Sequence, residues 1–420
     1  MSKSPGSHAP ALPRQPEINI GTIGHVDHGK TTLVEALTGT WASRHSEELR
    51  RGITIKLGYA DMAVYRCVHC NEPQCYCNSP ECPTCGSDTE FVRAVSFVDA
   101  PGHEILMTTM LSGAAVMDGA ILVIAADEPC PMPQTKEHLA AIEIMGLEKI
   151  VIVQNKIDIV TNEDAMKSYN QIRKFVAGTI AENAPIVPVS AQHRANIDLL
   201  LCTLQKSIPT PVRDPMKPGR MHIVRSFDIN RPGTALEDLE GGVIGGSIVQ
   251  GKFRVGDRIE ILPGFPARGK TGVDMHPLET EITSLYVGEH AVDEALGGGL
   301  VGVGTYLDPS VTKTDGLVGS MAGVPKSLPP VLKEMSLQSH LFEVVVGSED
   351  MKRVDPVTTG ESLLFNIGTS KTMATVTRAS KNKIDVKLSI AVCCEKGSRV
   401  AISRRIGGRW RLIGHGITEE

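Results

Sequence analysis

The sequence predicts an α/β P-loop domain, with a mainly parallel sheet and helices on both faces, followed by two all-β barrel domains. From Glu17 to Ile208, strand-like runs alternate with helix-like runs, as in parallel sheets covered by helices. A Gly-x-x-x-x-Gly-Lys-Thr motif stands between the first strand and the first helix. Beyond a proline-rich segment, glycines multiply and short apolar runs alternate, which is typical of small barrels.

The elements of the first domain follow from the spacing of apolar residues. Strands are expected at Asn19–Ile23, Ala94–Asp99, Ala120–Ala125, Lys149–Gln154 and Ile186–Pro188. Helices are expected at Thr32–Leu37, Glu104–Met117, Gln134–Met145, Glu163–Gly178 and Ile197–Lys206. Ligands of such sheets bind at the C-terminal ends of the strands, which is where the P-loop motif falls.

Composition shifts predict the domain boundaries. Residues 1–16 are rich in Pro and Ser and are expected to form a mobile tail, so the α/β domain covers 17–208. The segment IPTPVRDPMKPG at 208–219 contains four prolines and is expected to be a linker. A proline pair, Pro329–Pro330, marks the next boundary. The two barrels are therefore expected at 209–328 and 329–420.

Length, charge and hydropathy restrict the classes of protein that fit. The 420 residues are enough for roughly two to four domains with apolar cores. The longest apolar run, Gly119–Ala126, is far shorter than the about 18–20 residues that span a bilayer, so no membrane partner is expected. The net charge of −5 gives no sign of DNA binding, although the part from Leu328 onward carries 14 Lys and Arg against 10 Asp and Glu. The N-terminus lacks an apolar signal core, and a cytoplasmic location is expected.

The stretch GHVDHGKT at residues 24–31 has the spacing of a phosphate-binding loop. Gly24 and Gly29 would let the backbone curl so that successive N–H groups point at a phosphate. Lys30 would reach the β- and γ-phosphates, and the Thr31 hydroxyl would hold Mg²⁺. The residues expected to bind nucleotide here are Asp27, His28, Gly29, Lys30, Thr31 and Thr32.

Three further motifs narrow the nucleotide to GTP/GDP. DAPGH (99–103) closes a strand with Asp99, which can bind Mg²⁺ through water, and its Gly102 N–H can sense a γ-phosphate. In NKID (155–158), Asp158 can accept hydrogen bonds from the N1–H and exocyclic amine of guanine, which adenine cannot supply. Backbone N–H groups of SAQ (190–192) would close over the guanine O6. The residues expected around the base are Asn155, Lys156, Asp158, Ser190, Ala191 and Gln192.

The segment RGITI (51–55) lies between the P-loop and DAPGH, where a first switch segment belongs. Thr54 could reach Mg²⁺ by its hydroxyl only when a γ-phosphate is present, which would make this segment an order–disorder switch. As isolated residues, Arg51 and Thr54 are more often plain surface. Their position between the two motifs carries the argument.

Taken together, GHVDHGKT, RGITI, DAPGH and NKID resemble the translational GTPases related to elongation factor Tu. The resemblance implies a GTPase in which His103 helps to orient the attacking water, with Lys30 and Thr54 as the other catalytic residues. It also suggests a second magnesium ion near Asp27 and Gly52. By residue type alone, a His at a strand end is more often structural, and Asp27 could simply cap the loop.

Six of the ten cysteines crowd into Cys67–Cys85, which favours a metal site over disulfides. CVHC and CPTC are two Cys-x-x-Cys turns that can present four thiolates to one tetrahedral Zn²⁺. The expected zinc ligands are Cys67, Cys70, Cys82 and Cys85. Cys75 and Cys77 lie inside the same loop and could substitute or bind a second ion. The remaining cysteines are expected to be buried small hydrophobic residues: Cys130, Cys202, Cys393 and Cys394.

The cysteine cluster between the two switch motifs separates members of the larger group. This knuckle, the stretches RSFDINRPGT and GGVIGGSIVQG, and the ending RIGGRWRLIGHG are similar to the gamma-subunit family of archaeal and eukaryotic translation initiation factor 2. The resemblance implies a GTP-dependent carrier of methionylated initiator tRNA to the small ribosomal subunit. It also implies alpha and beta subunits as partners in a heterotrimer.

Two other functions stay open at this point. One is another tRNA-carrying GTPase, such as a general or a selenocysteine elongation factor. The cysteine cluster argues against the first, and the lack of a large C-terminal extension argues against the second. The other is a GTP-binding scaffold with negligible hydrolysis. Intact Lys30, Thr54 and His103 permit hydrolysis, but their presence does not give its rate.

Overall fold

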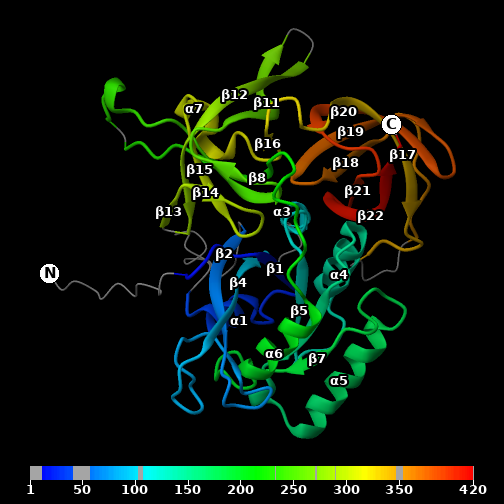
Figure 1. Ribbon diagram of the computed structural model, residues 1–420. Coiled ribbons are helices and arrows are strands. Elements are labelled where there is room, and N and C mark those ends of the chain that lie inside the picture. The colour runs from blue at the N-terminus through cyan, green and yellow to red at the C-terminus, as the bar shows by residue number, and fades with distance from the viewer. Residues whose placement is uncertain are drawn as a thin grey trace.

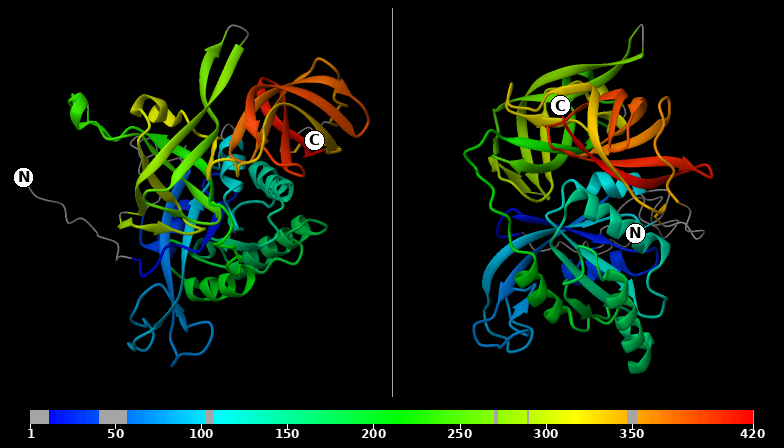
Figure 2. Two further views of the ribbon diagram at one scale, coloured as in Figure 1. Left: turned by 45° about the horizontal axis from the view of Figure 1, so that its top comes forward. Right: turned by 90° about the vertical axis from the view of Figure 1, so that its right-hand side faces the viewer.

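The computed structural model describes residues 12–40, 57–102, 107–231, 233–269, 272–288, 290–346 and 353–419. An α/β domain lies beneath two β-barrels in the view of Figure 1, and the two barrels lie side by side on it in Figure 2. The predicted fold class is therefore confirmed. We call the two later units the first barrel and the second barrel.

The α/β domain is built on a seven-stranded sheet with the order β3-β2-β4-β1-β5-β6-β7. The four neighbouring pairs from β4 to β7 are parallel, whereas β2 pairs antiparallel with both β4 and β3. The sheet is thus mainly parallel, with an antiparallel edge. Its strands are β1 (Ile18–Ile23), β2 (Gly58–Arg66), β3 (Tyr76–Cys77), β4 (Glu90–Asp99), β5 (Gly119–Ala125), β6 (Ile150–Asn155) and β7 (Ile186–Pro188).

Helices cover both faces of this sheet, and the period-two pattern of the strands explains why. On β5, Ile121 and Val123 pack with α1 and α6, whereas Leu122 and Ile124 pack with α3, α4 and α5 on the other face. The helices of this domain are α1 (Lys30–Thr38), α3 (Met107–Ala114), α4 (Pro133–Met145), α5 (Asn162–Val176) and α6 (Ile197–Ser207), with the short 3₁₀ helix η2 (Ile157–Ile159).

The sequence reading of this domain was wrong in a few places. It missed β2 and β3, because the buried side chains of β2 do not alternate regularly along the strand. The expected helix Glu104–Met117 ends at Ala114, and its first residues lie outside the described part of the chain. The strand expected from Lys149 begins one residue later, at Ile150. Cys130 is partly exposed, unlike the other three cysteines outside the knuckle.

The first barrel is a sheet with the order β11-β16-β8-β9-β15-β12-β13, closed by an additional pairing of β11 with β12. Its core is formed by inward residues such as Ile223, Ile261 and Val303. Its strands are β8 (Arg220–Phe227), β9 (Val243–Gln250), β11 (Arg258–Gly269), β12 (Gly272–Val287), β13 (His290–Val292), β15 (Val301–Thr305) and β16 (Met321–Gly323), and a two-stranded sheet adds β10 (Phe253–Arg254) and β14 (Glu294–Ala295). Its short helices are η3 (Leu236–Asp238), α7 (Pro309–Thr312) and η4 (Lys313–Asp315).

The second barrel is closed, with the order β17-β20-β19-β18-β21-β22. Phe365 and Val376 are among the fully buried side chains of its core. Its strands are β17 (Val331–Leu341), β18 (Ser362–Ile367), β19 (Ser370–Ala379), β20 (Lys383–Cys393), β21 (Arg399–Ile406) and β22 (Arg409–Thr418).

Buried polar contacts join the first barrel to the α/β domain. Asn19 of β1 donates from Nδ2 to the Ser247 hydroxyl at 2.8 Å and accepts on Oδ1 from the Gly299 N–H at 2.8 Å. Arg213, in the stretch between α6 and β8, donates to Asp118 at 2.6 Å and to the Glu17 carbonyl at 2.9 Å. A charge-assisted hydrogen bond is stronger than a neutral one, and a partly buried charge is costly to leave unpaired. These contacts therefore hold the connecting segment against the α/β domain.

Candidate functional site

The P-loop lies at the C-terminal end of β1, and its two glycines take conformations that favour glycine. Gly29 is the N-cap of α1 with φ at +85°. Gly24 has φ at +139°, and a Cβ there would lie 2.3 Å from the Val123 carbonyl oxygen. Between them Asp27 is also left-handed, with φ at +60°. The loop therefore curls tightly onto the sheet, and the N-terminus of α1 is available to an anion.

Lys30 lies within the cradle formed by this loop. Its Nζ donates to the His25 carbonyl at 2.6 Å, and a Cβ on Gly102 of DAPGH would come within 2.5 Å of it. Burial lowers the pKa of Lys30 to about 8, against the opposing effect of Asp99 and Asp27. A buried cation whose charge is poorly compensated is well suited to receive the oxygens of a phosphate.

Thr31 and Asp99 come together where α1 begins and β4 ends. The Thr31 hydroxyl donates to Asp99 Oδ2 at 2.7 Å, and the Thr22 hydroxyl donates to Asp99 Oδ1 at 2.9 Å. Asp99 is fully buried. A hydroxyl and a carboxylate side by side next to a phosphate loop are the oxygen donors that Mg²⁺ prefers, so these residues fit the expected magnesium site.

Asn155 links the P-loop to the segment SAQ. From the end of β6 its Nδ2 donates to the His28 carbonyl at 2.9 Å, and its Oδ1 accepts from the Ala191 N–H at 3.1 Å. The same Nδ2 lies so close to Gly29 that a Cβ there would approach it to 2.4 Å. A single buried amide thus fixes the phosphate part of the site relative to the base part.

Asp158 stands at the outer end of the site, in the 3₁₀ helix η2. The Ser190 hydroxyl beside it lowers the pKa of this carboxyl, and His193 Nε2 lies 3.6 Å from its Oδ2. Lys156 has φ at +61° and its Nζ lies 3.6 Å from Asp127. An ionised acid that accepts hydrogen bonds is the group that guanine recognition needs. Ser190 and Ala191 are buried, whereas the Gln192 side chain is exposed.

The structure brings together most of the residues expected to bind nucleotide, from three separate segments, the P-loop, NKID and SAQ. Thr32 lies in the first turn of α1. The His28 side chain points away from the cradle, because its ring contacts the Val123 carbonyl at 3.1 Å and Glu128 at 3.3 Å. Only the backbone of His28 is therefore available to a ligand. Four further predicted residues lie outside the described part of the chain: Arg51, Gly52, Thr54 and His103.

One residue in contact with the loop was missed by the sequence reading. His138 of α4 accepts a hydrogen bond on Nδ1 from the Gly24 N–H at 2.9 Å. It belongs to none of the nucleotide motifs. Its helix α4 buries residues on several sides, including the polar Thr135 and Glu137, so the sequence gives no signal of this contact.

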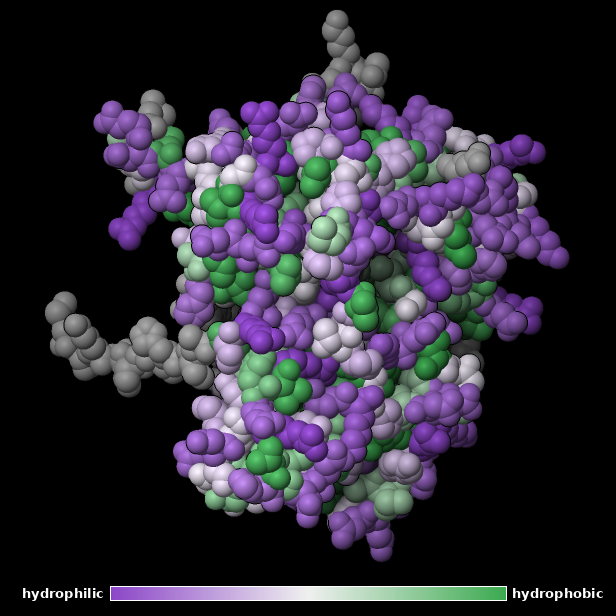
Figure 3. Space-filling view, in the orientation of Figure 1, coloured by the Kyte–Doolittle hydropathy of each residue, from purple (hydrophilic) through white to green (hydrophobic). Residues whose placement is uncertain are grey.

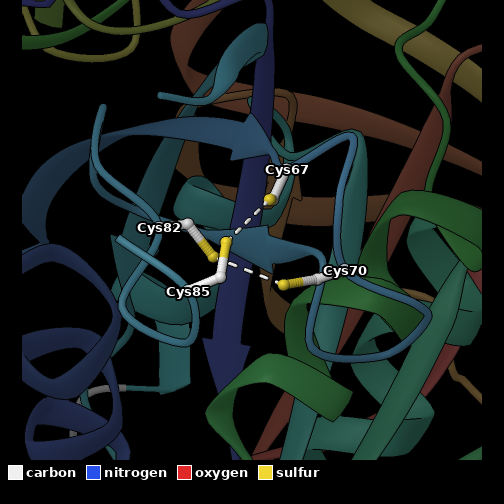
Figure 4. Close-up of side chains that lie close together, drawn as sticks. All are labelled: Cys67, Cys70, Cys82 and Cys85. Atoms are coloured by element: carbon white, nitrogen blue, oxygen red, sulfur yellow. Dashed lines mark hydrogen bonds between the residues drawn. The ribbon is translucent and has the colours of Figure 1, made fainter. Parts of the chain in front are cut away.

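The four predicted zinc ligands converge beyond β2 and β3 (Figure 4). The sulfur atoms of Cys67, Cys70, Cys82 and Cys85 all lie within 4.8 Å of one another. Two of the separations are 3.5 Å, between Cys67 and Cys85, and 3.7 Å, between Cys70 and Cys82. Tetrahedral zinc with bonds of about 2.3 Å requires sulfur atoms about 3.8 Å apart, so this cluster fits the ion.

The other two cysteines of this loop point elsewhere. The Cys77 thiol donates to the Ser79 carbonyl at 3.3 Å, and Cys75 joins neither of the two sulfur pairs. By contrast, hydrogen bonds from Ser87 lower the pKa of Cys85 to about 6, and the backbone N–H of Cys85 lowers that of Cys82, whereas the hydrogen bond with Cys85 raises the pKa of Cys70. Since metals bind thiolates, the lowered pKa of Cys85 and Cys82 suits a ligand, and the fit of the site rests on the convergence of the four sulfur atoms.

Comparison with known proteins identifies the family of the chain. The family model of the elongation factor Tu GTP binding domain matches residues 15–210, that of elongation factor Tu domain 2 matches 241–316, and that of initiation factor eIF2 gamma, C terminal, matches 333–418. Translation initiation factor 2 subunit gamma from Pyrococcus horikoshii is 59% identical over 407 residues, which cover 97% of this chain and 98% of that protein. The chain belongs to the translation initiation factor 2 subunit gamma family.

A second relative of the same name, from Methanocaldococcus jannaschii, is 56% identical over 406 residues and covers 97% of this chain and 98% of its own. The family resemblance inferred from the motifs is confirmed. Because the family consists of translational GTPases, the chain is a GTP-binding initiation factor that hydrolyses GTP, and GTP/GDP and Mg²⁺ are the cofactors that the family implies.

Solved structures agree with this fold. A bacterial selenocysteine-specific elongation factor EF-Sec superimposes with a TM-score of 0.72 at 23% identity, over 96% of this chain and 58% of the other. The elongation factor SelB from Methanococcus maripaludis, in complex with a GTP analogue, gives a TM-score of 0.70 at 22% identity, over 97% of this chain and 79% of the other. In the described residues, no helix is both long and apolar enough to cross a membrane.

Proposed function

We propose that this chain is the GTP-switched subunit that carries methionylated initiator tRNA to the small ribosomal subunit, together with alpha and beta subunits. The place of this activity is the cytoplasm. The observation that carries the proposal is the four-cysteine cluster inserted between the P-loop and Asp99. The two relatives reported above are both named subunit gamma, and their similarity to this chain extends over nearly their whole length. The residue boundaries that we propose are 17–208, 209–328 and 329–420, with the knuckle at about 67–85.

The nucleotide roles of individual residues are part of the proposal. Lys30 neutralises the β- and γ-phosphates from inside the cradle, and Asp158 accepts the guanine N1–H and amine. Thr31, with Asp99 through water, holds Mg²⁺, which when bound offsets phosphate charge. The backbone N–H of Gln192 would close over the guanine O6, whereas that of Ala191 donates to Asn155 Oδ1 at 3.1 Å. We propose that Cys67, Cys70, Cys82 and Cys85 bind a structural zinc ion.

Residues outside the described part of the chain complete the proposed machinery. Thr54 would join the magnesium site only with GTP, and His103 would orient the attacking water. Gly52 and Asp27 would serve a second magnesium ion. These roles follow from the family pattern. A His103→Ala variant with an unchanged single-turnover rate would remove His103 from the mechanism.

The tRNA would bind through a local basic surface, because the whole chain is acidic. Our candidate is the region from Leu328 onward, which contains the second barrel and the residues that lead into it. This region carries 14 Lys and Arg against 10 Asp and Glu. On the face drawn in Figure 3, hydrophilic residues predominate and apolar residues are scattered, as on most protein surfaces. If phosphate contacts dominate, affinity for tRNA falls steeply as salt rises.

The test is a binding assay with charged tRNAs. The chain with its alpha and beta subunits is titrated with methionylated initiator tRNA and with charged elongator tRNAs, in GTP and in GDP. We expect tight binding of initiator tRNA with GTP. We expect weaker binding of initiator tRNA with GDP and of elongator tRNAs with either nucleotide. Equal affinity for all charged tRNAs would favour an elongation-type carrier, and no binding with normal GTP affinity would favour a scaffold.

A further inference from the structure

The three domains leave a cavity of about 500 Å³ where they meet, which we call the junction cavity. Its walls come from the turns that follow α3 and α4 in the α/β domain, and from β8, β9 and β16 of the first barrel. The second barrel adds the turn between β18 and β19 and the stretch that follows β20. A volume of this size is within the range of small-molecule binding sites.

Hydrogen bonds between the domains hold the walls of the junction cavity in place. The Ser370 hydroxyl of the second barrel donates to the Gly319 carbonyl of the first. Arg220 of β8 donates from Nη1 to Glu395 Oε1 at 2.5 Å. Arg399 of β21 donates from Nη1 to two carbonyls at the end of α4, at 3.1 and 3.2 Å. All five of these residues line the cavity, so its shape is set before a ligand arrives, which lowers the entropic cost of binding.

Two buried polar groups of the lining lack a partner. Thr369 is 3% exposed, and its Oγ1 makes no hydrogen bond to any described residue. Nε of Arg220 is also buried and without a partner among these residues, although both terminal nitrogens of the same side chain donate, to Glu395 and to the Ser327 carbonyl. A buried polar group is costly to leave unpaired. Since a ligand oxygen can accept from a hydroxyl as well as from an N–H, both groups favour a ligand that accepts hydrogen bonds.

Ion pairs neutralise two acidic residues of the lining. Asp118 Oδ1 accepts from Arg213 Nη2 at 2.6 Å, and both of these side chains are mostly buried. Glu395 is the partner of Arg220. Because each carboxylate already faces a guanidinium, neither repels an anion as a free carboxylate would.

The remaining charges of the lining favour an anion. Lys149 and Arg399 stand against the single carboxylate of Glu148, which leaves an excess of positive charge. His222 also lines the cavity, and burial lowers its pKa to about 4, so its ring is neutral at physiological pH. Positive charge that lines a hollow attracts anions and raises their local concentration.

Apolar side chains from all three domains form the rest of the lining. Met145 lies at the end of α4, Met321 begins β16, and Ile367 ends β18, with Pro329 between the two barrels. Methionine thioethers make favourable contacts with aromatic rings, and so does a guanidinium such as that of Arg399. The apolar part of the cavity therefore suits an aromatic body.

We propose that the junction cavity binds a small aromatic acid, an aromatic sulfonate or carboxylate. The acidic group accepts hydrogen bonds from the two unpartnered groups, and the ring lies against the methionines. None of the proposed nucleotide residues lines this cavity, so the site is separate from the P-loop. Because the ligand contacts all three domains of the folded chain, its binding raises the thermal midpoint of unfolding.

The test uses 8-anilinonaphthalene-1-sulfonate, an aromatic sulfonate whose fluorescence rises in apolar surroundings. The full-length chain is first saturated with GDP and Mg²⁺, so that nucleotide occupies its own site, and is then titrated with the probe. We expect one saturable site per chain and a thermal midpoint that rises with probe concentration. Naphthalene-1-sulfonate should displace the probe, whereas 1-naphthalenemethanol, a neutral molecule with the same ring, should compete about 10-fold less well.

A cavity-filling variant tests the location of the site. Val249→Phe places a larger side chain in the cavity from β9, and we expect the probe to bind about 10-fold more weakly. Val255→Phe is the matched control. Val255 belongs to the same barrel, is 44% exposed and is not part of the lining, so the affinity should stay within about 2-fold of the original.

A second pair of variants tests the polar contact. Thr369→Val removes the unpartnered hydroxyl and keeps the shape of the side chain, so we expect about 5-fold weaker probe binding with an unchanged thermal midpoint in the absence of probe. Thr372→Val should do the reverse. Thr372 of β19 is 2% exposed and its hydroxyl donates to the Ile390 carbonyl at 2.9 Å, so its loss lowers the midpoint and spares the affinity.

These measurements decide the inference. It would be overturned by the absence of a saturable site, or by a site that neither Val249→Phe nor Thr369→Val weakens. Equal competition by the neutral alcohol and the sulfonate would overturn the preference for an acid. Should Val249→Phe fail to fold, the comparison of Thr369→Val with Thr372→Val carries the test. A chain that binds GDP but not the probe refutes this site alone, whereas a chain that fails to bind GDP refutes the proposed nucleotide site.

Discussion

Thr31 and Asp99 form a hydrogen bond of 2.7 Å between the first turn of α1 and the end of β4. Since Thr22 occupies the other carboxylate oxygen at 2.9 Å, the side chain of Asp99 is held from both sides before any ligand arrives. The two positions that we propose for the magnesium site are thus preorganised by the fold, which reduces the entropy that ordering them would cost on binding.

Asp99→Asn should weaken the dependence of nucleotide affinity on Mg²⁺. The change keeps the shape of the side chain and removes a buried negative charge that favours the cation. We expect the ratio of GDP affinities with and without Mg²⁺ to shrink by about 10-fold, a loss typical of outer-shell metal partners. Titration of Mg²⁺ at fixed nucleotide measures this ratio.

Thr22→Val is the control for that change, because Thr22 contacts Asp99 through the oxygen that faces away from Thr31. It should lower stability slightly and weaken the response to Mg²⁺ far less than Asp99→Asn does, because the carboxylate charge stays in place. A magnesium response in Asp99→Asn equal to that of the original protein would contradict the assignment.

Asp158→Asn should change the base that the site accepts. The carboxylate needs two donors from the base, whereas an amide offers one donor and one acceptor and so matches N1–H and the C2 carbonyl of xanthine. We expect GDP affinity to fall by about 100-fold or more and xanthosine diphosphate to bind. Competition against fluorescent GDP gives both values. Asp164→Asn, which removes an exposed carboxylate at the start of α5, should leave the preference for guanine intact.

Much of this site could be predicted because its chemistry is local in the sequence. Each motif contains residues that we propose to contact the nucleotide, and each stands at the end of a strand, so strand order alone brings Lys30, Asp99 and Asn155 to one edge of the sheet. The Cys-x-x-Cys turns are equally local, since each turn presents two sulfur atoms by itself.

The parts that escaped prediction depend on contacts between distant segments. His138 reaches Gly24 across 114 positions of sequence, and Arg411 reaches Glu137 across 274. Nothing in the periodicity of α4 distinguishes His138 and Glu137 from its other polar residues, because this helix has no single apolar face. The strand β2 was missed for a related reason: its burial is decided by β4 and the edge of the sheet, and not by alternation within Gly58–Arg66.

The knuckle should bind one zinc ion per chain, and the ion should be lost when one ligand is removed. Cys82→Ser replaces a soft thiolate with a hydroxyl that binds zinc poorly, so elemental analysis of the purified chain should show little or no zinc. Cys77→Ser is the matched control, because the Cys77 thiol already donates to the Ser79 carbonyl and not toward the cluster. Loss of zinc in Cys77→Ser with retention in Cys82→Ser would mean that the ligands were assigned wrongly.

His138 should remain neutral down to strongly acidic pH and should make the stability of the chain fall as the pH is lowered. Burial, aided by the charge of Lys30, lowers its pKa to about 3, below the value of about 6.5 expected in the unfolded chain. A lowered histidine pKa means that the stabilisation is fully present above about pH 6.5 and is lost progressively toward pH 3. Between those limits the unfolded state takes up a proton that the folded state does not, which costs about 1.4 kcal/mol per pH unit.

The asparagine in His138→Asn does not titrate, so the variant does not lose stability in this way. The difference in thermal midpoint between the original protein and the variant should therefore narrow from pH 7 to pH 5. Histidine NMR gives an independent reading, and a His138 resonance that titrates between pH 5 and 7 would contradict the buried acceptor.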